Sequence, residues 1–161
     1  PSVGLHTNGY SLARKLLFEV AGYTVDTRVD ELGMTVGEAL LRPHVSYLKP
    51  LEGLLNSGMI KALAHITGGG LTDNIPRILP ERCAVEINRG SWPVLPVFKL
   101  MQKMGNVSEP EMYRTFNMGV GMVIVTSPED SQTIKSHLQQ RDMMVYEIGR
   151  VTKGNREVSI E

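Results

Sequence analysis

The stretch "KALAHITGGGLTDNIPRILP" (residues 61–80) runs from an apolar, strand-like segment through three consecutive glycines into a helix-like segment. Glycine loses more backbone entropy on folding than any other residue, so a run of three needs a reason. One reason is a tight turn between a strand and a helix. The other is the close approach of a ligand to backbone that a Cβ atom would shield. The spacing alone leaves both interpretations open.

Within this stretch, "HITGGG" places the Thr67 hydroxyl and three successive backbone N–H groups just before a helix. Such groups can converge on an anion, and the helix dipole favours negative charge there. The spacing is neither that of a P-loop nor that of G-x-G-x-x-G. Asp73 is the one acidic residue in a suggestive position. His65 is either a core histidine with one hydrogen bond or a neutral imidazole that contacts a ligand.

Apolar periodicity predicts the elements around this stretch. Helices are expected at 10–21, 35–41, 50–58, 71–79, 94–105, 108–116 and 127–142, and strands at 61–67, 83–88, 119–127, 144–151 and 156–161. Capping residues support several helix starts: Thr7 or Asn8, the pairs Thr35/Glu38 and Ser108/Glu111, and Ser127 followed by Pro128. Pro76 is expected to delay or kink its helix.

The order of these elements predicts the fold class. The segment 119–127 is nearly continuously apolar, which is typical of a strand buried on both faces by helices. The last two strands, joined through "TKGN", are expected to form a hairpin. Residues 1–161 are therefore predicted to be a single α/β (α+β) domain, with helices packed on both faces of a mixed β-sheet.

Composition excludes several classes of function. The 17 Lys and Arg balance the 17 Asp and Glu, so the formal net charge is zero and no general attraction to nucleic acid is expected. Cys83 is the only cysteine, which rules out an intrachain disulfide and favours a reducing compartment. No apolar run approaches the ~20 residues that span a bilayer, and no secretion signal opens the chain. A cytoplasmic protein without membrane contact is expected.

Two further motifs contain candidate binding residues. "GLHTNGYS" (4–11) groups His6, Thr7 and Asn8 before a helix, as a capped helix start or as a surface facing a ligand. "RTFNMGVGM" (114–122) places Asn117 at a helix end and Gly119 at a strand start, where left-handed backbone or close approach would explain them.

Sequence motifs for catalysis are scarce. No nucleophile elbow, Cys/His signature or close carboxylate pair is present, so spacing alone does not define an enzyme. His44 and His137 have no partners at metal-ligand spacing and are expected at the surface.

Three segments, "GLHTNGYSLARKLL", "AHITGGGLTDNIPRILP" and "EMYRTFNMGVGMVIV", closely resemble the C-terminal domain of the phosphoribosylformylglycinamidine cyclo-ligase (aminoimidazole ribonucleotide synthetase) family, in the same order and over essentially the whole chain. The resemblance implies ATP-dependent ring closure of formylglycinamidine ribonucleotide in de novo purine synthesis. In that family, ATP activates the formyl oxygen as a phosphate ester, an internal nitrogen closes the ring, and phosphate leaves.

The resemblance also implies partners that this chain lacks. ATP and Mg²⁺ would be bound mainly by an N-terminal domain absent here, the active site would lie between the two domains, and the full-length enzyme would be a homodimer. The start at Pro1, without an initiator Met, is interpreted as a cut within a longer protein. The fragment alone is expected to be inactive and to bind no cofactor tightly.

The residues carried over by motif would bind the phosphorylated ribonucleotide: His6, Thr7, Asn8, His65, Thr67, Gly68, Gly69, Gly70, Asn117 and Gly119. His6 and His65 are the candidates for a catalytic role, which the sequence does not assign, and no metal ligand is predicted. Two alternatives remain. One is a related ATP-dependent synthetase, such as a formylglycinamidine ribonucleotide synthase, and the other is a non-catalytic phosphate-ligand-binding or assembly domain.

Overall fold

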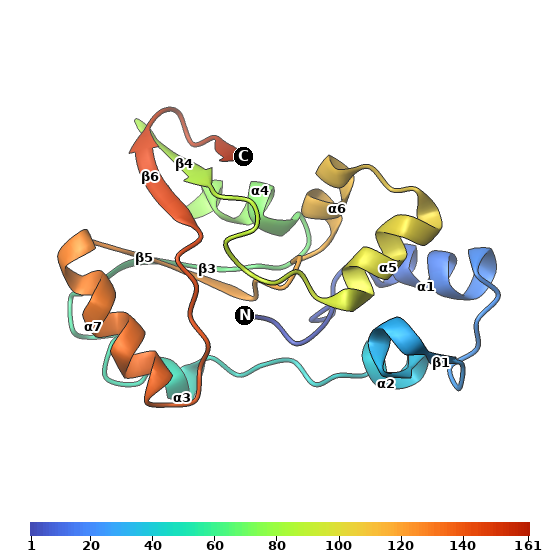
Figure 1. Ribbon diagram of the computed structural model, residues 1–161. Coiled ribbons are helices and arrows are strands. Elements are labelled where there is room, and N and C mark those ends of the chain that lie inside the picture. Colours follow the sequence, from blue (N-terminus) through green and yellow to red (C-terminus); the bar gives the residue numbers. More distant parts are fainter.

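The computed structural model describes residues 1–161 and contains two groups of helices joined by long strands (Figure 1). The helices are α1 (Tyr10–Arg14), which continues as one π-helical segment (Lys15–Val20), α2 (Val36–Leu40), α3 (Leu48–Leu51), α4 (Gly70–Asn74), α5 (Pro96–Gly105), α6 (Glu109–Thr115) and α7 (Pro128–Gln139), with 3₁₀ turns at Asp30–Leu32 and Pro76–Ile78. The strands are β1 (Arg28–Val29), β2 (Met34–Thr35), β3 (Ile60–His65), β4 (Cys83–Ile87), β5 (Met122–Thr126), β6 (Gly149–Lys153) and β7 (Val158–Ile160).

The strands form three sheets. β1 and β2 form a short antiparallel pair, and β3 pairs antiparallel with β5. The third sheet has the order β6-β4-β7 and is mixed, because β4 runs antiparallel to β6 and parallel to β7. The α/β class predicted from the sequence, with a mixed sheet, is confirmed.

Two expectations about the strands are wrong. The last two strands do not form a hairpin, because β4 lies between them and takes one partner on each edge. β5 is not buried on both faces: it pairs with β3 alone, and all five of its residues are half-buried. Residues 122–126 instead line a mostly apolar cavity of about 440 Å³, bordered also by α7 and residues 143–151.

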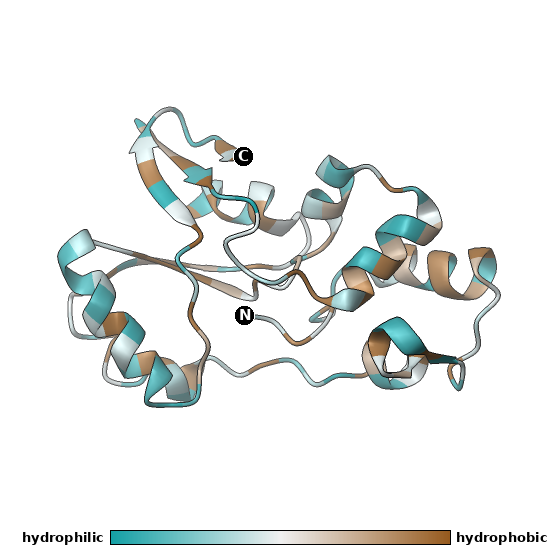
Figure 2. Ribbon diagram, viewed as in Figure 1, coloured by the Kyte–Doolittle hydropathy of each residue, from teal (hydrophilic) through white to brown (hydrophobic).

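Two hydrophobic clusters hold the helices in place. The larger contains 24 buried residues and includes Leu5, Leu17, Phe98 and Phe116. The smaller packs Leu51 and Leu54, in and after α3, against Ile134 and Leu138 of α7, and the two helices lie together at one end of the molecule (Figure 1). Helices α5 and α7 alternate between apolar and polar residues along their length, as helices with one buried face do (Figure 2).

Local signals placed several helix ends correctly. Thr35 and Glu38 form the predicted capping box at α2, with Glu38 N donating to Thr35 Oγ1 at 3.1 Å and Thr35 N to Glu38 Oε2 at 2.7 Å. Ser127 caps α7, and Pro128 is its first residue. Gly22 adopts a left-handed φ of 67° where the first helix ends. Pro76 separates α4 from a 3₁₀ turn, as its missing N–H predicts.

Other helix signals were misleading. Ser108 makes no capping bond, and Glu111 accepts instead from Thr115 Oγ1 at 3.0 Å. The predicted helix 50–58 is only α3, followed by turns, because Gly53 adopts a left-handed φ of 85°. Neither Thr7 nor Asn8 caps α1: both side chains donate to the His6 carbonyl, and Gly9 occupies the cap position.

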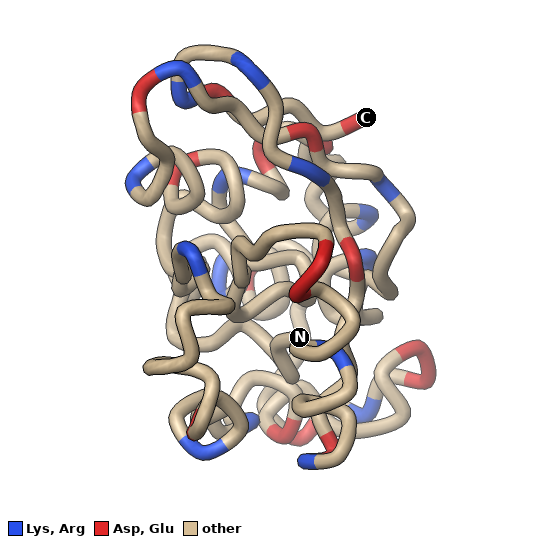
Figure 3. The backbone as a smooth tube through the Cα atoms, turned by 90° about the vertical axis from the view of Figure 1, so that its left-hand side faces the viewer, with Lys and Arg blue, Asp and Glu red and all other residues tan.

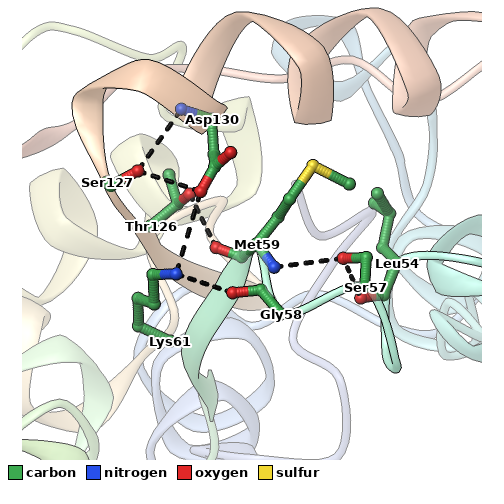
Figure 4. Close-up of polar contacts among 8 residues, drawn as sticks. All are labelled: Leu54, Ser57, Gly58, Met59, Lys61, Thr126, Ser127 and Asp130. Carbon is green, nitrogen blue, oxygen red and sulfur yellow. Dashed lines mark hydrogen bonds and ion pairs between the residues drawn. The ribbon is translucent and has the colours of Figure 1, made fainter.

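A polar network joins the start of α7 to the strands beside it (Figure 4). Lys61 Nζ donates to the Gly58 carbonyl at 2.6 Å and lies 3.8 Å from Asp130 Oδ2, and Thr126 Oγ1 donates to the Met59 carbonyl at 2.9 Å.

Acidic and basic residues are interspersed over both ends of the molecule (Figure 3). None of the helices is long and apolar enough to cross a bilayer.

Candidate phosphate-binding loop and histidine cluster

The three glycines of the loop that follows β3 have different surroundings. A Cβ atom on Gly70, whose φ is 58°, would lie 1.9 Å from the Tyr113 carbonyl oxygen, and one on Gly69, whose φ is 96°, would lie 2.6 Å from Asp73 Cβ. The fold therefore requires glycine at both positions. A Cβ on Gly68 would meet only Asn8 Oδ1, at 3.7 Å, and Gly68 is exposed with no positive φ. Internal packing does not explain Gly68.

The backbone amides of the loop also differ. The Gly70 N–H donates to the Thr67 carbonyl at 3.0 Å, whereas the amides of Gly68 and Gly69 have no acceptor within the protein. Two adjacent free donors at a surface without side chains suit an anion such as phosphate. The carboxylate of Asp73 lies against Gly69, so the Gly68 side, next to Asn8, is electrostatically the more favourable approach.

A cluster of three histidines and a tyrosine lies at the same end of β3. The His6 and His44 rings stack with their centroids 4.0 Å apart, and His44 Nε2 lies 3.1 Å from His65 Nε2. The centroid of the Tyr47 ring lies 6.3 Å from the centroid of each of the three imidazole rings. The Tyr47 hydroxyl donates to the Pro1 carbonyl at 2.8 Å. A Cβ on Gly121 would lie 1.8 Å from Tyr47 Oη, so this glycine makes room for the cluster.

Burial shifts the pKa values of three members of this cluster: His6, His65 and Tyr47. His6 is only 2% exposed, and its burial, reinforced by His44 and His65, lowers its pKa to about 4. Its Nε2 accepts from the amides of Val3 (3.3 Å) and Val45 (3.4 Å), while its buried Nδ1 has no partner. Burial and the neighbouring His44 also lower the pKa of His65, and burial raises that of Tyr47 to about 12. At neutral pH, His6 is therefore an uncharged imidazole.

Sequence reasoning missed part of this site. His44 is at the surface, as predicted, yet it bridges the other two histidines. His65 is exposed, so the interpretation of it as a core residue is wrong. His137, expected at the surface, is half-buried with an unpartnered Nε2. No group of three or more His, Cys, Asp or Glu side chains is arranged to hold a metal ion.

Asn117 and Gly119 lie next to this cluster but face inward. Asn117 is completely buried: its Oδ1 accepts from Ser2 Oγ (2.7 Å) and from the Gly119 amide (2.9 Å). Its Nδ2 donates to the carbonyls of Gly4 (2.9 Å) and Leu5 (3.1 Å). A Cβ on Gly119 would lie 3.0 Å from the Pro93 carbonyl. Asn117 thus fixes the position of the segment that carries His6. Direct ligand binding by Asn117 or Gly119 stays a prediction.

Comparison with known proteins agrees with this architecture. The fold, helices on mixed and antiparallel sheets, is shared with a thiamine-monophosphate kinase from Stenotrophomonas maltophilia (TM-score 0.64, 14% identity, 99% of this chain and 48% of that one). It is shared also with Escherichia coli HypE, a hydrogenase maturation protein (TM-score 0.62, 18% identity, 99% of this chain and 44% of that one). At these identities the likeness concerns the fold alone.

The family follows from closer matches. The family described as "AIR synthase related protein, C-terminal domain" matches residues 1–160, and the chain belongs to it. The chain is 50% identical over 157 residues to a phosphoribosylformylglycinamidine cyclo-ligase of Brevibacillus brevis, covering 98% of this chain and 45% of that protein. It is 48% identical over 153 residues to the enzyme of the same name from Bifidobacterium longum subsp. infantis, covering 94% and 44%. The chain thus spans less than half the length of these relatives.

Proposed function

We propose that this chain is the substrate-phosphate-binding part of a phosphoribosylformylglycinamidine cyclo-ligase. The whole protein would use ATP to close the imidazole ring of aminoimidazole ribonucleotide, in the cytoplasm and as a homodimer. The observation that carries the proposal is Gly68: an exposed glycine with a free amide that neither backbone geometry nor packing requires. The amides of Gly68 and Gly69 offer a ribose phosphate two free N–H donors on unobstructed backbone.

The neighbouring groups support roles beyond phosphate binding. Asn8 lies beside Gly68 and donates to the carbonyl of His6, whose buried imidazole is uncharged at neutral pH. His65, which precedes the loop, is solvent-exposed and therefore accessible to a ligand. The proposal assigns the metal and most of the ATP site to the N-terminal part of the longer relatives, as the family resemblance implies.

The phosphate-binding claim is tested by Gly68→Val. A side chain at this position meets no internal obstacle, so the free energy of unfolding should change by less than about 1 kcal/mol. The affinity for ribose 5-phosphate, measured by calorimetry, should fall at least about tenfold, because the side chain covers the free amides.

The control for this substitution is Gly4→Ala, with the smaller side chain because Gly4, unlike Gly68, is buried. Gly4 is the other glycine of the chain that has no positive φ and at which an added Cβ atom would meet no other atom closer than 3.4 Å. Its replacement should leave ribose 5-phosphate binding unchanged. Equal binding by wild type and Gly68→Val would show that the loop holds no phosphate.

The enzymatic part of the proposal is tested by complementation. These 161 residues alone should not form aminoimidazole ribonucleotide from formylglycinamidine ribonucleotide and ATP, and addition of a separately expressed N-terminal part of a relative should restore turnover. Turnover by the chain alone would contradict a site shared between two parts. Phosphate binding that persists without any restored turnover would favour a non-catalytic binding domain.

A further inference from the structure

Asn74, the last residue of α4, contacts nearly every residue of the glycine loop. Its Nδ2 lies within hydrogen-bonding distance of three carbonyl oxygens: Gly70 at 2.8 Å, Gly68 at 3.2 Å and Thr67 at 3.3 Å. Its Oδ1 accepts from Thr67 Oγ1 at 3.1 Å and from Arg77 Nη1 at 3.2 Å. Asn74 is only 5% exposed, so these contacts are shielded from water.

These contacts determine which way the free amides point. In a trans peptide, the C=O of one residue and the N–H of the next point in opposite directions, and the chain contains no cis peptide. The Thr67 carbonyl points toward Asn74, so the Gly68 N–H in the same peptide plane points away from it. The Gly68 carbonyl likewise orients the Gly69 N–H outward. Asn74 therefore contacts both peptide planes whose amides have no internal acceptor: it shares the Thr67 carbonyl with the Gly70 N–H and is the one donor to the Gly68 carbonyl.

We infer that Asn74 is a positioning residue, which keeps the amides of Gly68 and Gly69 directed at a bound phosphate without touching the ligand. The inference rests on the proposed function for the identity of that ligand. Arg77 and Thr67 fix the orientation of the Asn74 amide, because each donates to its oxygen and so leaves the nitrogen facing the loop carbonyls. No side chain other than Asn74 donates to the Thr67 or Gly68 carbonyl.

The substitution Asn74→Asp tests this role, because it keeps the shape and the acceptor oxygen but replaces the donor with a carboxylate facing three carbonyls. The backbone amide resonances of Gly68 and Gly69 should shift in the ¹H–¹⁵N NMR spectrum. The affinity for ribose 5-phosphate should fall at least about tenfold at a temperature where the variant is fully folded. Asn56→Asp, the same change at an exposed position with no side-chain hydrogen bond, is the control and should alter neither readout.

The two readouts separate this inference from the proposed function. Failure of the wild-type chain to bind ribose 5-phosphate would refute the phosphate site, while the glycine resonances would still test whether Asn74 orients the loop. Unchanged glycine resonances, or an affinity within twofold of wild type, would overturn the positioning role. If Asn74→Asp does not fold, Thr67→Val removes one of the two donors that orient the Asn74 amide, and the Gly68 and Gly69 resonances should shift by less than in Asn74→Asp. Wild-type resonances of both glycines in that variant would also overturn the inference.

Discussion

Asn117→Ala is expected to lower the free energy of unfolding by about 3 to 5 kcal/mol, because it removes a hydrogen bond from four buried polar groups, of which only the Leu5 carbonyl keeps another donor, the Asn8 amide. Those groups are the Ser2 hydroxyl, the Gly119 amide and the carbonyls of Gly4 and Leu5, all bonded to the one completely buried amide. Asn117 connects the first five residues to the segment before β5 across more than 110 positions of sequence. No water reaches this position to replace the lost bonds.

Chemical denaturation of the wild type and of Asn117→Ala measures the effect directly. Asn56→Ala, at an exposed asparagine without side-chain hydrogen bonds, is the matched control and should change the stability by less than about 0.5 kcal/mol. A loss below about 1 kcal/mol for Asn117→Ala would mean that the segment carrying His6 is held by other contacts.

The second large effect is a dependence of stability on pH that originates at His6. Burial lowers the pKa of His6 from 6.5 to about 4 in the folded protein. Between these values the unfolded chain binds a proton that the folded chain does not, so stability falls as the pH decreases from about 6.5 to 4. Above about pH 6.5 His6 is uncharged in both the folded and the unfolded chain, so the stability that depends on its neutral form is fully retained. A shift of this size corresponds to about 3 kcal/mol.

The measurement compares wild type with His6→Gln, whose side-chain oxygen can still accept from the amides of Val3 and Val45. Unfolding free energies at pH 7 and pH 4 should differ by about 3 kcal/mol more in the wild type than in the variant. His65, whose pKa is also lowered, is present in both proteins and therefore cancels in the comparison. Identical pH profiles would show that His6 is accessible to water.

The sequence predicted best what depends on neighbouring residues. The capping box at Thr35 and Glu38, the start of α7 at Ser127 and Pro128, and the break at Pro76 each involve groups within a few positions of one another. The exceptions have local causes as well. The left-handed turn at Gly53 shortens α3, and Ser108 has the residue type of a cap without its hydrogen bond.

Long-range contacts could not be predicted in this way. The insertion of β4 between β6 and β7 depends on pairing between segments about 70 residues apart, for which no local signal exists. His44 joins His6 across 38 positions by ring stacking, and its sequence neighbours give no sign of it. Asn74 is the one missed residue with a usable signal: a polar side chain that helical spacing places on the side of α4 facing the loop.

The glycine triplet illustrates the same limit. Sequence alone offered a turn or a ligand site as alternatives, and the structure explains two of the three glycines by the turn, while the ligand site at the third is a proposal. Gly69 and Gly70 are explained by backbone geometry and by their neighbours, whereas Gly68 is explained by neither. Only the three-dimensional surroundings distinguish these cases, because the distinction lies in Tyr113 and Asp73, which approach two of the three glycines.

The most direct test of the phosphate-binding loop is a titration of the ¹⁵N-labelled chain with ribose 5-phosphate, followed through the amide resonances of Gly68 and Gly69. We expect both resonances to move downfield and to saturate together, since each N–H gains a charged acceptor, while the Gly70 amide, already bonded to Thr67, moves little. Saturable shifts elsewhere with these two glycines unmoved would contradict the account.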